Sequence, residues 1–276
     1  MIGDQDGLNR GMVALTGVMS HRVGSAAPPI FIVGSPRSGT SLLRLILDSH
    51  PAIACGPETH VLADLDESLG RHWDRLARYG AEREHWHDAY REAFARLKAD
   101  YAARRGKARW ADKTPAYAQH LQFVTALFPD AQVIHVIRDA RHVTASALAR
   151  WGWRRAWAMP QMWRESVEKA REFGRDADPG RYREVRFEQL VGATEDTLRR
   201  VFEWLGEDWD PCVLDYDRFD HDGTGRNRIV STAARERSGT AIDPSRARSE
   251  SRSLDLLLRA RIERVAGPLN RELGYV

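Results

Sequence analysis

The feature that most constrains the fold is an apolar segment that runs into a glycine-containing turn and then into a leucine-rich segment. It reads PIFIVGSPRSGTSLLRLILDSHP and extends from Pro29 to Pro51. The consecutive apolar residues 30–33 are typical of a buried strand, and the apolar residues within 42–47 predict a helix that ends before Pro51. A buried strand that turns directly into a helix is typical of an α/β protein.

Two further segments support this expectation, because 132–139 and 182–187 read as buried strands and a helical pattern follows each of them. Strands that alternate with helices predict a parallel sheet covered on both faces. We therefore expect an α/β fold of the P-loop-like kind, with three layers (α/β/α) around a central parallel sheet. A helical insert is expected after the first strand–helix unit.

The chain is expected to form one domain. Residues 1–27 predict a flexible N-terminal arm, and 28–276 a single domain whose helical insert occupies 62–105. The polar segment 220–253 is long for a loop, so it predicts either a lid over a site or a disordered, arginine-rich stretch.

Composition excludes several classes of protein. Hydrophobic residues make up 42% and charged residues 29% of the 276, which is typical of soluble globular proteins, and the net charge of +3 does not indicate a nucleic-acid partner. No stretch is long enough to span a membrane and we find no signal peptide, so a cytoplasmic protein is expected. The two distant cysteines predict neither a disulfide framework nor a metal site.

The turn GSPRSGTS, residues 34–41, is a candidate anion site. The first turn of a helix has unpaired N–H groups and a partial positive charge, and glycine lets the backbone approach an anion closely. Arg37 would add a full positive charge, and the hydroxyl groups of the turn would add donors. An ordinary strand-to-helix turn is the simpler alternative.

The turn departs from the nucleotide-binding P-loop of an NTPase. Such a loop places Gly-Lys-Ser/Thr at the helix start, whereas this chain has Gly39-Thr40-Ser41 and carries its basic residue, Arg37, inside the loop. The missing lysine and the lack of a clear Walker-B strand count against a P-loop nucleotide kinase. That kinase stays an alternative, as does a non-catalytic nucleotide-binding module.

GSPRSGTSLLRLILDSHP resembles the 5′-phosphosulfate loop of sulfotransferases that use 3′-phosphoadenosine 5′-phosphosulfate (PAPS). In this family the loop holds the phosphate and the sulfonate of the donor, and no metal ion is needed. The resemblance implies a set of donor-binding residues. They are Pro36, Arg37, Ser38, Gly39, Thr40 and Ser41.

VIRDARHVTASALARW, residues 136–151, resembles the 3′-phosphate segment of the same family. Arg138 at the strand end can bind a phosphate bidentately, and Ser146 on the following helix can donate its hydroxyl. Arg150 falls on another donor-binding arginine of the family. Taken alone, the pattern fits equally well a strand end with an ion pair between Arg138 and Asp139.

CGPETHVL and DKTP resemble segments of the branch that contains tyrosylprotein sulfotransferases and their bacterial relatives, and place Glu58 and Lys113 on functional residues of that branch. The implied reaction is in-line transfer of a sulfonate to an acceptor hydroxyl, whose proton a base must take. Glu58 is the candidate base and His60 its rival. Arg37 and Lys113 would stabilise the charge that builds on the leaving bisphosphate.

Two later segments complete the resemblance. FEQLV carries Phe187 where the family has tyrosine, so any contact made by that hydroxyl is absent here. ERSGTAIDPSRARSES resembles the family's late donor-binding stretch. The residues that it implies are Ser238, Arg248 and Arg252.

The acceptor is not fixed by the sequence. A small-molecule, lipid or sugar hydroxyl is expected, and a peptide tyrosine and a homodimeric state remain open alternatives.

Overall fold

A computed structural model describes residues 27–222 and 254–275. Its centre is a five-stranded sheet in the order β2-β3-β1-β4-β5, in which all neighbouring strands are parallel. The expectation of an α/β fold around a parallel sheet is therefore confirmed. The strands are β1 (Ile30–Gly34), β2 (Ile53–Cys55), β3 (Arg109–Lys113), β4 (Gln132–Ile137) and β5 (Tyr182–Arg186).

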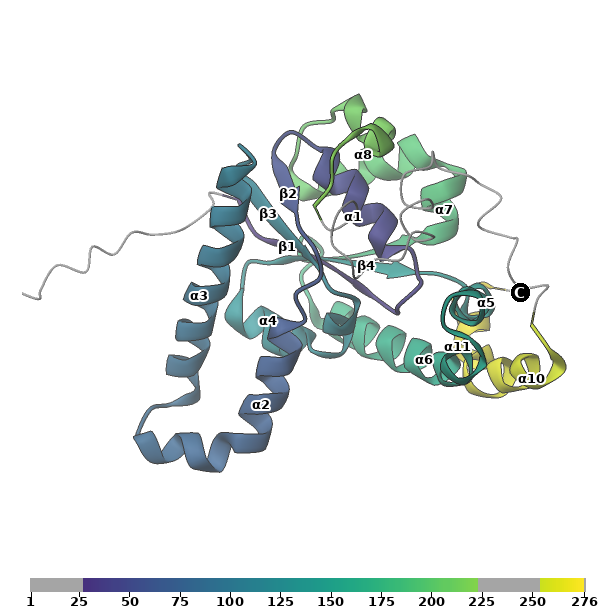
Figure 1. Ribbon diagram of the computed structural model, residues 1–276, viewed down its shortest axis with the longest axis horizontal. Helices are drawn as coiled ribbons and strands as arrows, with labels where there is room; N and C mark the ends of the chain where they lie inside the picture. The colour runs from purple at the N-terminus through teal and green to yellow at the C-terminus, as the bar shows by residue number, and fades with distance from the viewer. Residues whose placement is uncertain (1–26, 223–253, 276) are drawn as a thin grey trace, which may run out of the picture.

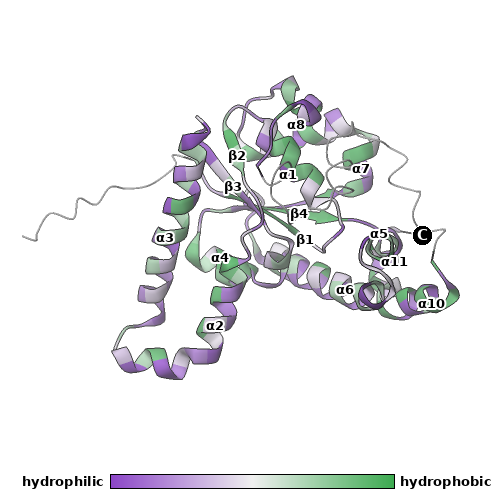
Figure 2. Cartoon of the chain, in the orientation of Figure 1, coloured by the Kyte–Doolittle hydropathy of each residue, from purple (hydrophilic) through white to green (hydrophobic). Residues whose placement is uncertain are grey.

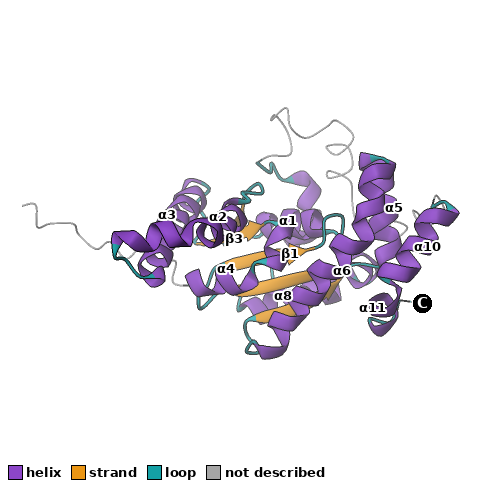
Figure 3. Cartoon of the chain, turned by 90° about the horizontal axis from the view of Figure 1, so that it is seen from below, coloured by secondary structure: helices purple, strands orange, loops and turns teal. Residues whose placement is uncertain are grey.

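Helices cover both faces of the sheet, which gives the three layers visible from below in Figure 3. One face carries α1 (Thr40–Ser49), α7 (Phe187–Gly192), α8 (Thr194–Leu205) and η3 (Pro211–Arg218). The other carries α2 (Val61–Leu76), α3 (Arg83–Arg104), η2 (Pro115–Gln119), α4 (Leu121–Leu127) and α6 (Trp153–Asp176). Nowhere in 27–222 or 254–275 is a helix long and apolar enough to cross a membrane.

A third group of helices packs beside the end of β4. It contains α5 (Ala140–Trp151), α10 (Leu256–Val265) and α11 (Gly267–Glu272), which share a core with α6. The C-terminal helical segment is divided at Ala266, and Gly267 and Pro268 begin α11. Figure 1 shows this group at the opposite end of the molecule from α2 and α3.

The apolar run of β1 is continuous because both faces of this central strand are buried. Successive side chains of a strand point to opposite faces of the sheet. Ile30 and Ile32 pack in the core under α1, whereas Phe31 and Val33 pack in the core under α4 and α6, and all of them are fully buried. Both faces are covered, so both sets must be apolar, and Figure 2 shows β1 mainly in green between helices that carry many purple residues.

Strands β2 and β3 were not expected from the sequence. β2 has only three residues, and β3 reads RWADK, a charged segment that nonetheless is buried. Arg109 tolerates burial because its guanidinium donates to the carbonyl groups of Pro28 and Leu205 and pairs with Glu207 at 2.8 Å. The pattern of apolar residues therefore missed a strand whose polar groups are satisfied inside the protein.

The helical insert consequently begins after β2 rather than directly after α1. It consists of α2, the short helix η1 (Ala77–Tyr79) and α3, and it extends away from the sheet as the arm on the left of Figure 1. Its helices extend from Val61 to Tyr79 and from Arg83 to Arg104. The expected N-terminal arm, apart from residue 27, lies outside the described residues, and so does nearly all of the lid segment.

The order of the strands creates a topological switch point at the carboxyl ends of β1 and β4, and we call the region outside these strand ends the crevice. The chain leaves β1 into α1 on one face, whereas it leaves β4 through α5 into α6 on the other face. β1 and β4 are paired neighbours, with Gly34 opposite Val136, so the two exits diverge from adjacent strand ends. Ligands of open α/β sheets bind at such a switch point, outside the carboxyl ends of the strands.

One core residue, His135 on β4, must stay neutral in the folded protein. It is fully buried, and its Nδ1 lies 2.7 Å from the hydroxyl of Tyr182. Within the part of the chain that is described, its Nε2 has no hydrogen-bond partner. Burial, with the charges of Arg186 and Arg171 adding to it, lowers the pKa of His135 to about 3.

We predict that His135 makes the protein sensitive to mild acid. Below the unfolded pKa of about 6.5, the unfolded chain binds a proton that the folded protein does not bind until about pH 3, so stability falls as pH falls through this window. In His135→Gln this loss is absent. The difference in unfolding free energy between wild type and variant should change by about 1 kcal/mol between pH 7 and pH 5.5. Urea unfolding at both pH values measures it, and a constant difference would contradict the prediction.

Candidate functional site

The residues singled out from the sequence meet at the carboxyl edge of the sheet. Arg37 follows β1, Arg138 follows β4, Lys113 ends β3 and Glu58 follows β2. Segments that lie far apart in the sequence thus approach one another because parallel strands all end at this edge.

The loop after β1 fits an anion. Helix α1 begins at Thr40, and among the described residues no side chain caps it and its first turn has no acid. The Ser38 side chain is 1% exposed, yet its Oγ has no hydrogen-bond partner within the described chain. A buried hydroxyl without a partner is costly, and the start of a helix is positively polarised, so an anionic oxygen would satisfy both.

Two glycines shape this loop. Gly34 and Gly39 have φ values of 148° and 101°, which side-chain-bearing residues rarely adopt. A Cβ on Gly34 would lie 2.4 Å from the carbonyl oxygen of Val136, and one on Gly39 would lie 2.2 Å from a ring carbon of Phe187. The loop therefore requires glycine for both its conformation and its packing.

Arg37 and Arg138 meet at the same loop. Arg37 has a φ of 73°, a strained value for a residue other than glycine, and its Nε donates to Ser146 Oγ at 3.1 Å. Its guanidinium carbon lies 5.6 Å from the centroid of a Trp151 ring. Arg138 donates from Nη1 to the carbonyl of Arg37 at 3.3 Å. One bound molecule can therefore contact both arginines and Ser146.

Arg138 is held by residues whose roles the sequence did not reveal. Its carbonyl accepts a hydrogen bond of 2.8 Å from Nε1 of the buried Trp163, and its guanidinium carbon lies 4.3 Å from the ring centroid of Phe187. Phe187 thus contacts both the glycine loop and Arg138 through its ring. Only its missing hydroxyl was apparent from the sequence.

Asp139, the alternative partner for Arg138, is bound to Arg141. Arg141 donates to it from the backbone N–H at 2.8 Å and from Nε at 3.0 Å. Burial alone would raise the pKa of Asp139, but these hydrogen bonds hold it below its usual value. The carboxylate is therefore a cap for α5 rather than a group of the crevice.

Glu58, His60 and Lys113 form one contiguous set. Lys113, only 4% exposed, forms an ion pair with Glu58 Oε1 and donates to Ser41 Oγ at 3.2 Å. His60 Nε2 lies 3.2 Å from Glu58 Oε2. The two candidate bases are thus direct neighbours, and Lys113 connects them to the anion loop.

The remaining predicted residues divide into two groups. Arg150 lies in the last turn of α5, four residues after Ser146 and therefore on the same side of the helix. Ser238, Arg248 and Arg252 lie outside the described residues. Across 27–222 and 254–275, no group of three or more His, Cys, Asp or Glu residues could hold a metal ion.

A sequence profile of the sulfotransferase family matches residues 28–211, more than half of the chain. The chain belongs to the sulfotransferase family. The matched range contains both arginines, the glycine loop, Glu58 and Lys113. The resemblance identified from the sequence motifs is therefore confirmed.

Individual sulfotransferases agree with this assignment. The protein-tyrosine sulfotransferase of Drosophila melanogaster is 31% identical over 207 residues, which cover 70% of this chain but only 40% of that protein. Protein-tyrosine sulfotransferase A of Caenorhabditis elegans is 27% identical over 271 residues, covering 90% of this chain and 67% of the relative. The chain thus spans less than half the length of the fly protein.

A solved structure shows the same architecture. The sulfotransferase domain of the Synechococcus PCC 7002 olefin synthase superposes with a TM-score of 0.65 and 25% sequence identity. The match covers 88% of this chain and 95% of that domain. The three-layer fold is therefore that of a sulfotransferase.

We predict that Gly39→Ala weakens binding of adenosine 3′,5′-bisphosphate, the molecule that PAPS would become after losing its sulfonate. The added Cβ meets the Phe187 ring, so either the loop or the ring must move away from Arg138. We expect affinity to fall about tenfold or more and stability to fall by about 1–3 kcal/mol. Calorimetry and thermal unfolding measure the two effects.

Gly80→Ala is the matched control. Gly80 also has a positive φ, 74°, but no described atom lies within 4 Å of a Cβ built there. It should share part of the stability loss and none of the loss of affinity. Unchanged affinity in Gly39→Ala would show that the loop does not bind this nucleotide.

Proposed function

We propose that the protein transfers the sulfonate group of PAPS to a hydroxyl group of an acceptor. The observation that carries this proposal is the convergence, at one switch point, of an anion loop with a buried unsatisfied hydroxyl, two arginines and a lysine–glutamate pair. The family supports the donor, because sulfotransferases of this kind use PAPS. When bound, PAPS supplies an activated sulfonate and a bisphosphate leaving group.

The donor's two phosphate-bearing ends would be held by different parts of the crevice. The loop around Ser38 and the start of α1 offer backbone N–H groups and hydroxyls to the phosphosulfate end. Arg138, Ser146 and Arg150 offer positive charge and a hydroxyl to the 3′-phosphate. Arg37 connects the two ends, because its backbone belongs to the loop around Ser38 whereas its side chain donates to Ser146.

Lys113 is placed to stabilise the leaving group. Its ammonium group contacts Ser41 at the start of α1, where the phosphosulfate would lie. A fixed positive charge beside the oxygen that accumulates charge lowers the barrier more than it strengthens ground-state binding. Since Lys113 is almost completely buried, water screens this charge weakly.

Glu58 is placed to accept the proton of the acceptor hydroxyl. Its side chain is 36% exposed, so an acceptor from solvent can reach it, and its contact with Lys113 puts it beside the reacting sulfonate. His60 contacts the second carboxylate oxygen, and we assign it the role of orienting Glu58. The acceptor is a hydroxyl of a small molecule, a lipid, a sugar or a tyrosine side chain.

The donor prediction is tested by calorimetry of the wild-type protein. Adenosine 3′,5′-bisphosphate should bind more tightly than ATP, whereas a P-loop kinase would show the reverse order. Arg138→Ala should weaken bisphosphate binding about 10- to 100-fold, because charge-assisted hydrogen bonds are lost. Arg199→Ala, which removes an exposed helix arginine paired with Glu195, is the control and should bind normally.

The catalytic prediction concerns Glu58→Gln. Without its base the enzyme should lose about 10²- to 10⁴-fold in kcat, while bisphosphate affinity stays unchanged. Transfer of labelled sulfonate to a panel of phenols, alcohols, sugars, lipids and a tyrosine peptide measures turnover. His60→Gln should lose much less.

The same panel separates the alternatives. Full turnover in Glu58→Gln would remove Glu58 from the mechanism, and a larger loss in His60→Gln would make His60 the base. Tight bisphosphate binding without any transfer would favour a non-catalytic nucleotide-binding module.

A further inference from the structure

A buried ion pair lies beneath the Glu58–Lys113 pair and joins the helical insert to the sheet. Lys98 on α3 is 4% exposed, and its Nζ lies 2.9 Å from Oδ2 of Asp112, which is fully buried on β3. Asp112 directly precedes Lys113. Charges buried this deeply must be paired and fully hydrogen-bonded to be tolerated. The hydrogen bonds around the pair therefore show which residues it holds in position.

The Asp112 carboxylate organises the two threonines next to the site. Its Oδ2 also accepts from Thr59 Oγ1 at 3.2 Å, and its Oδ1 accepts from Thr114 Oγ1 at 2.7 Å. Thr114 Oγ1 in turn accepts from the backbone N–H of Thr59 at 3.3 Å. Thr59 is therefore bound to this network by both its side chain and its backbone.

Tyr117 completes the network. Its hydroxyl lies 2.9 Å from Thr59 Oγ1 and accepts from the N–H of Leu62 at 3.1 Å. Since Thr59 gives its hydroxyl proton to Asp112, Tyr117 must be the donor to Thr59. Burial, to which the Asp112 charge adds, raises the pKa of Tyr117 to about 12, so that proton is retained.

The direction of every hydrogen bond depends on the charge of Asp112. A carboxylate accepts from Lys98, Thr59 and Thr114 at once, which leaves each hydroxyl with one donor and one acceptor role. A neutral amide in its place could not accept all of these bonds. The ammonium group of Lys98 lies 2.9 Å from this carboxylate and provides the opposite charge beside it.

The network fixes the segment that carries both candidate bases. Thr59 lies between Glu58 and His60, and Leu62 lies in the first turn of α2. The residues that bind Thr59 and Leu62 are Asp112, Thr114 and Tyr117. They all belong to 112–117, the segment that also carries Lys113. Lys98, a residue of the insert, therefore helps to set the position of Glu58 relative to Lys113, because it pairs with the Asp112 carboxylate that binds Thr59.

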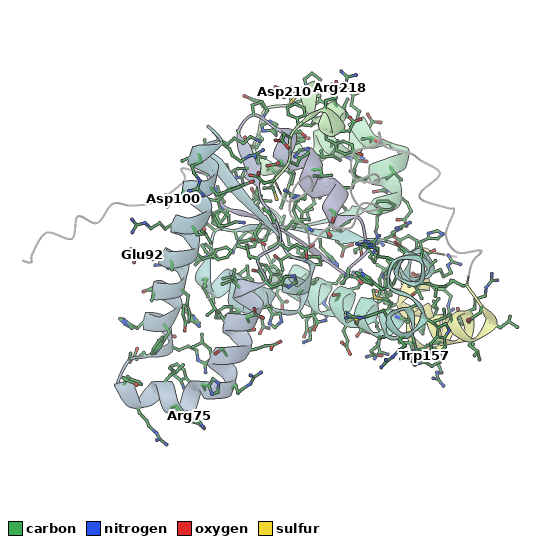
Figure 4. All side chains as sticks on the ribbon, viewed as in Figure 1. Arg75, Glu92, Asp100, Trp157, Asp210 and Arg218 are labelled. Atoms are coloured by element: carbon green, nitrogen blue, oxygen red, sulfur yellow. The ribbon has the colours of Figure 1, made fainter. Side chains whose placement is uncertain are left out.

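We propose that Lys98 and Asp112 are positioning residues for sulfonate transfer: their ion pair holds Thr59, and through it Glu58, against Lys113. The inference rests on the proposed function and assigns the helical insert a part in catalysis. Figure 4 shows Glu92 and Asp100, which are exposed residues of the same helix, on the side of α3 away from the sheet. Lys98, in contrast, is buried and contacts Asp112 of the sheet.

The test uses variants that remove the ion pair and the hydroxyl that it holds. Lys98→Met, Asp112→Asn and Thr59→Val should each lower kcat about 10- to 100-fold, as expected for a displaced catalytic group. Bisphosphate affinity should stay within about twofold of wild type, because the anion loop is not part of the network. Thr59→Ser, which keeps the hydroxyl, should restore kcat.

The double variant Lys98→Met/Asp112→Asn covers the case in which a single variant leaves a buried charge and does not fold. It should lose no more kcat than the more affected single variant, since both changes remove the same clamp. Losses that multiply would show that the two residues act independently, and would overturn the proposal.

Two controls separate positioning from stability. Glu207→Gln breaks the ion pair with Arg109 at the other end of β3, and Asp100→Asn changes an exposed residue of α3. Glu207→Gln should lower the melting temperature without lowering kcat, measured well below that temperature. Asp100→Asn should change neither quantity.

Amide hydrogen exchange gives a readout that does not depend on turnover. In Lys98→Met, exchange at Thr59 and Leu62 should rise about tenfold or more, whereas the sheet amides keep wild-type protection. Unchanged exchange at these amides, a uniform rise across the sheet, or raised exchange with wild-type kcat would each overturn the proposal. If the wild-type protein transferred no sulfonate, this result would instead contradict the proposed function and, with it, the positioning role.

Discussion

The site depends on the parallel pairing of β1 with β4. Gly34 lies opposite Val136 and so close to it that no side chain fits between them. This approach brings the two strand ends together while their chains leave toward opposite faces of the sheet. Arg37 and Arg138 meet because of this pairing, since neither segment could otherwise present its charge at the same point. The rest of the crevice is added around that junction.

Much of this arrangement could be predicted from the sequence. The apolar runs of β1 and β4 identified the central strands, and the glycine-rich turn between β1 and α1 identified the candidate anion loop. Motif resemblance then placed Glu58 and Lys113, which periodicity alone would not have found. Such features are local, so a short stretch of sequence is enough to define them.

The rest of the site could not be predicted without the structure, because it consists of contacts between segments that lie far apart in the sequence. β3 is charged, and its burial follows from partners such as Glu207 that lie far along the chain. The ring of Phe187 contacts Gly39 across the crevice, which no local pattern encodes. Lys98 resembles any exposed lysine of a polar helix until α3 is packed against β3. Side-chain networks of this kind have no sequence spacing of their own.

The two halves of the crevice are formed by different structural elements. The half that we propose for the donor consists of strand ends and the backbone of a glycine loop, so it cannot change without altering the sheet itself. The half that holds Glu58 is bordered by an arm that projects from the body of the protein. Under the proposed function, remodelling of the arm could therefore change the acceptor molecule without altering the strand ends, provided that Lys98 keeps its ion pair with Asp112.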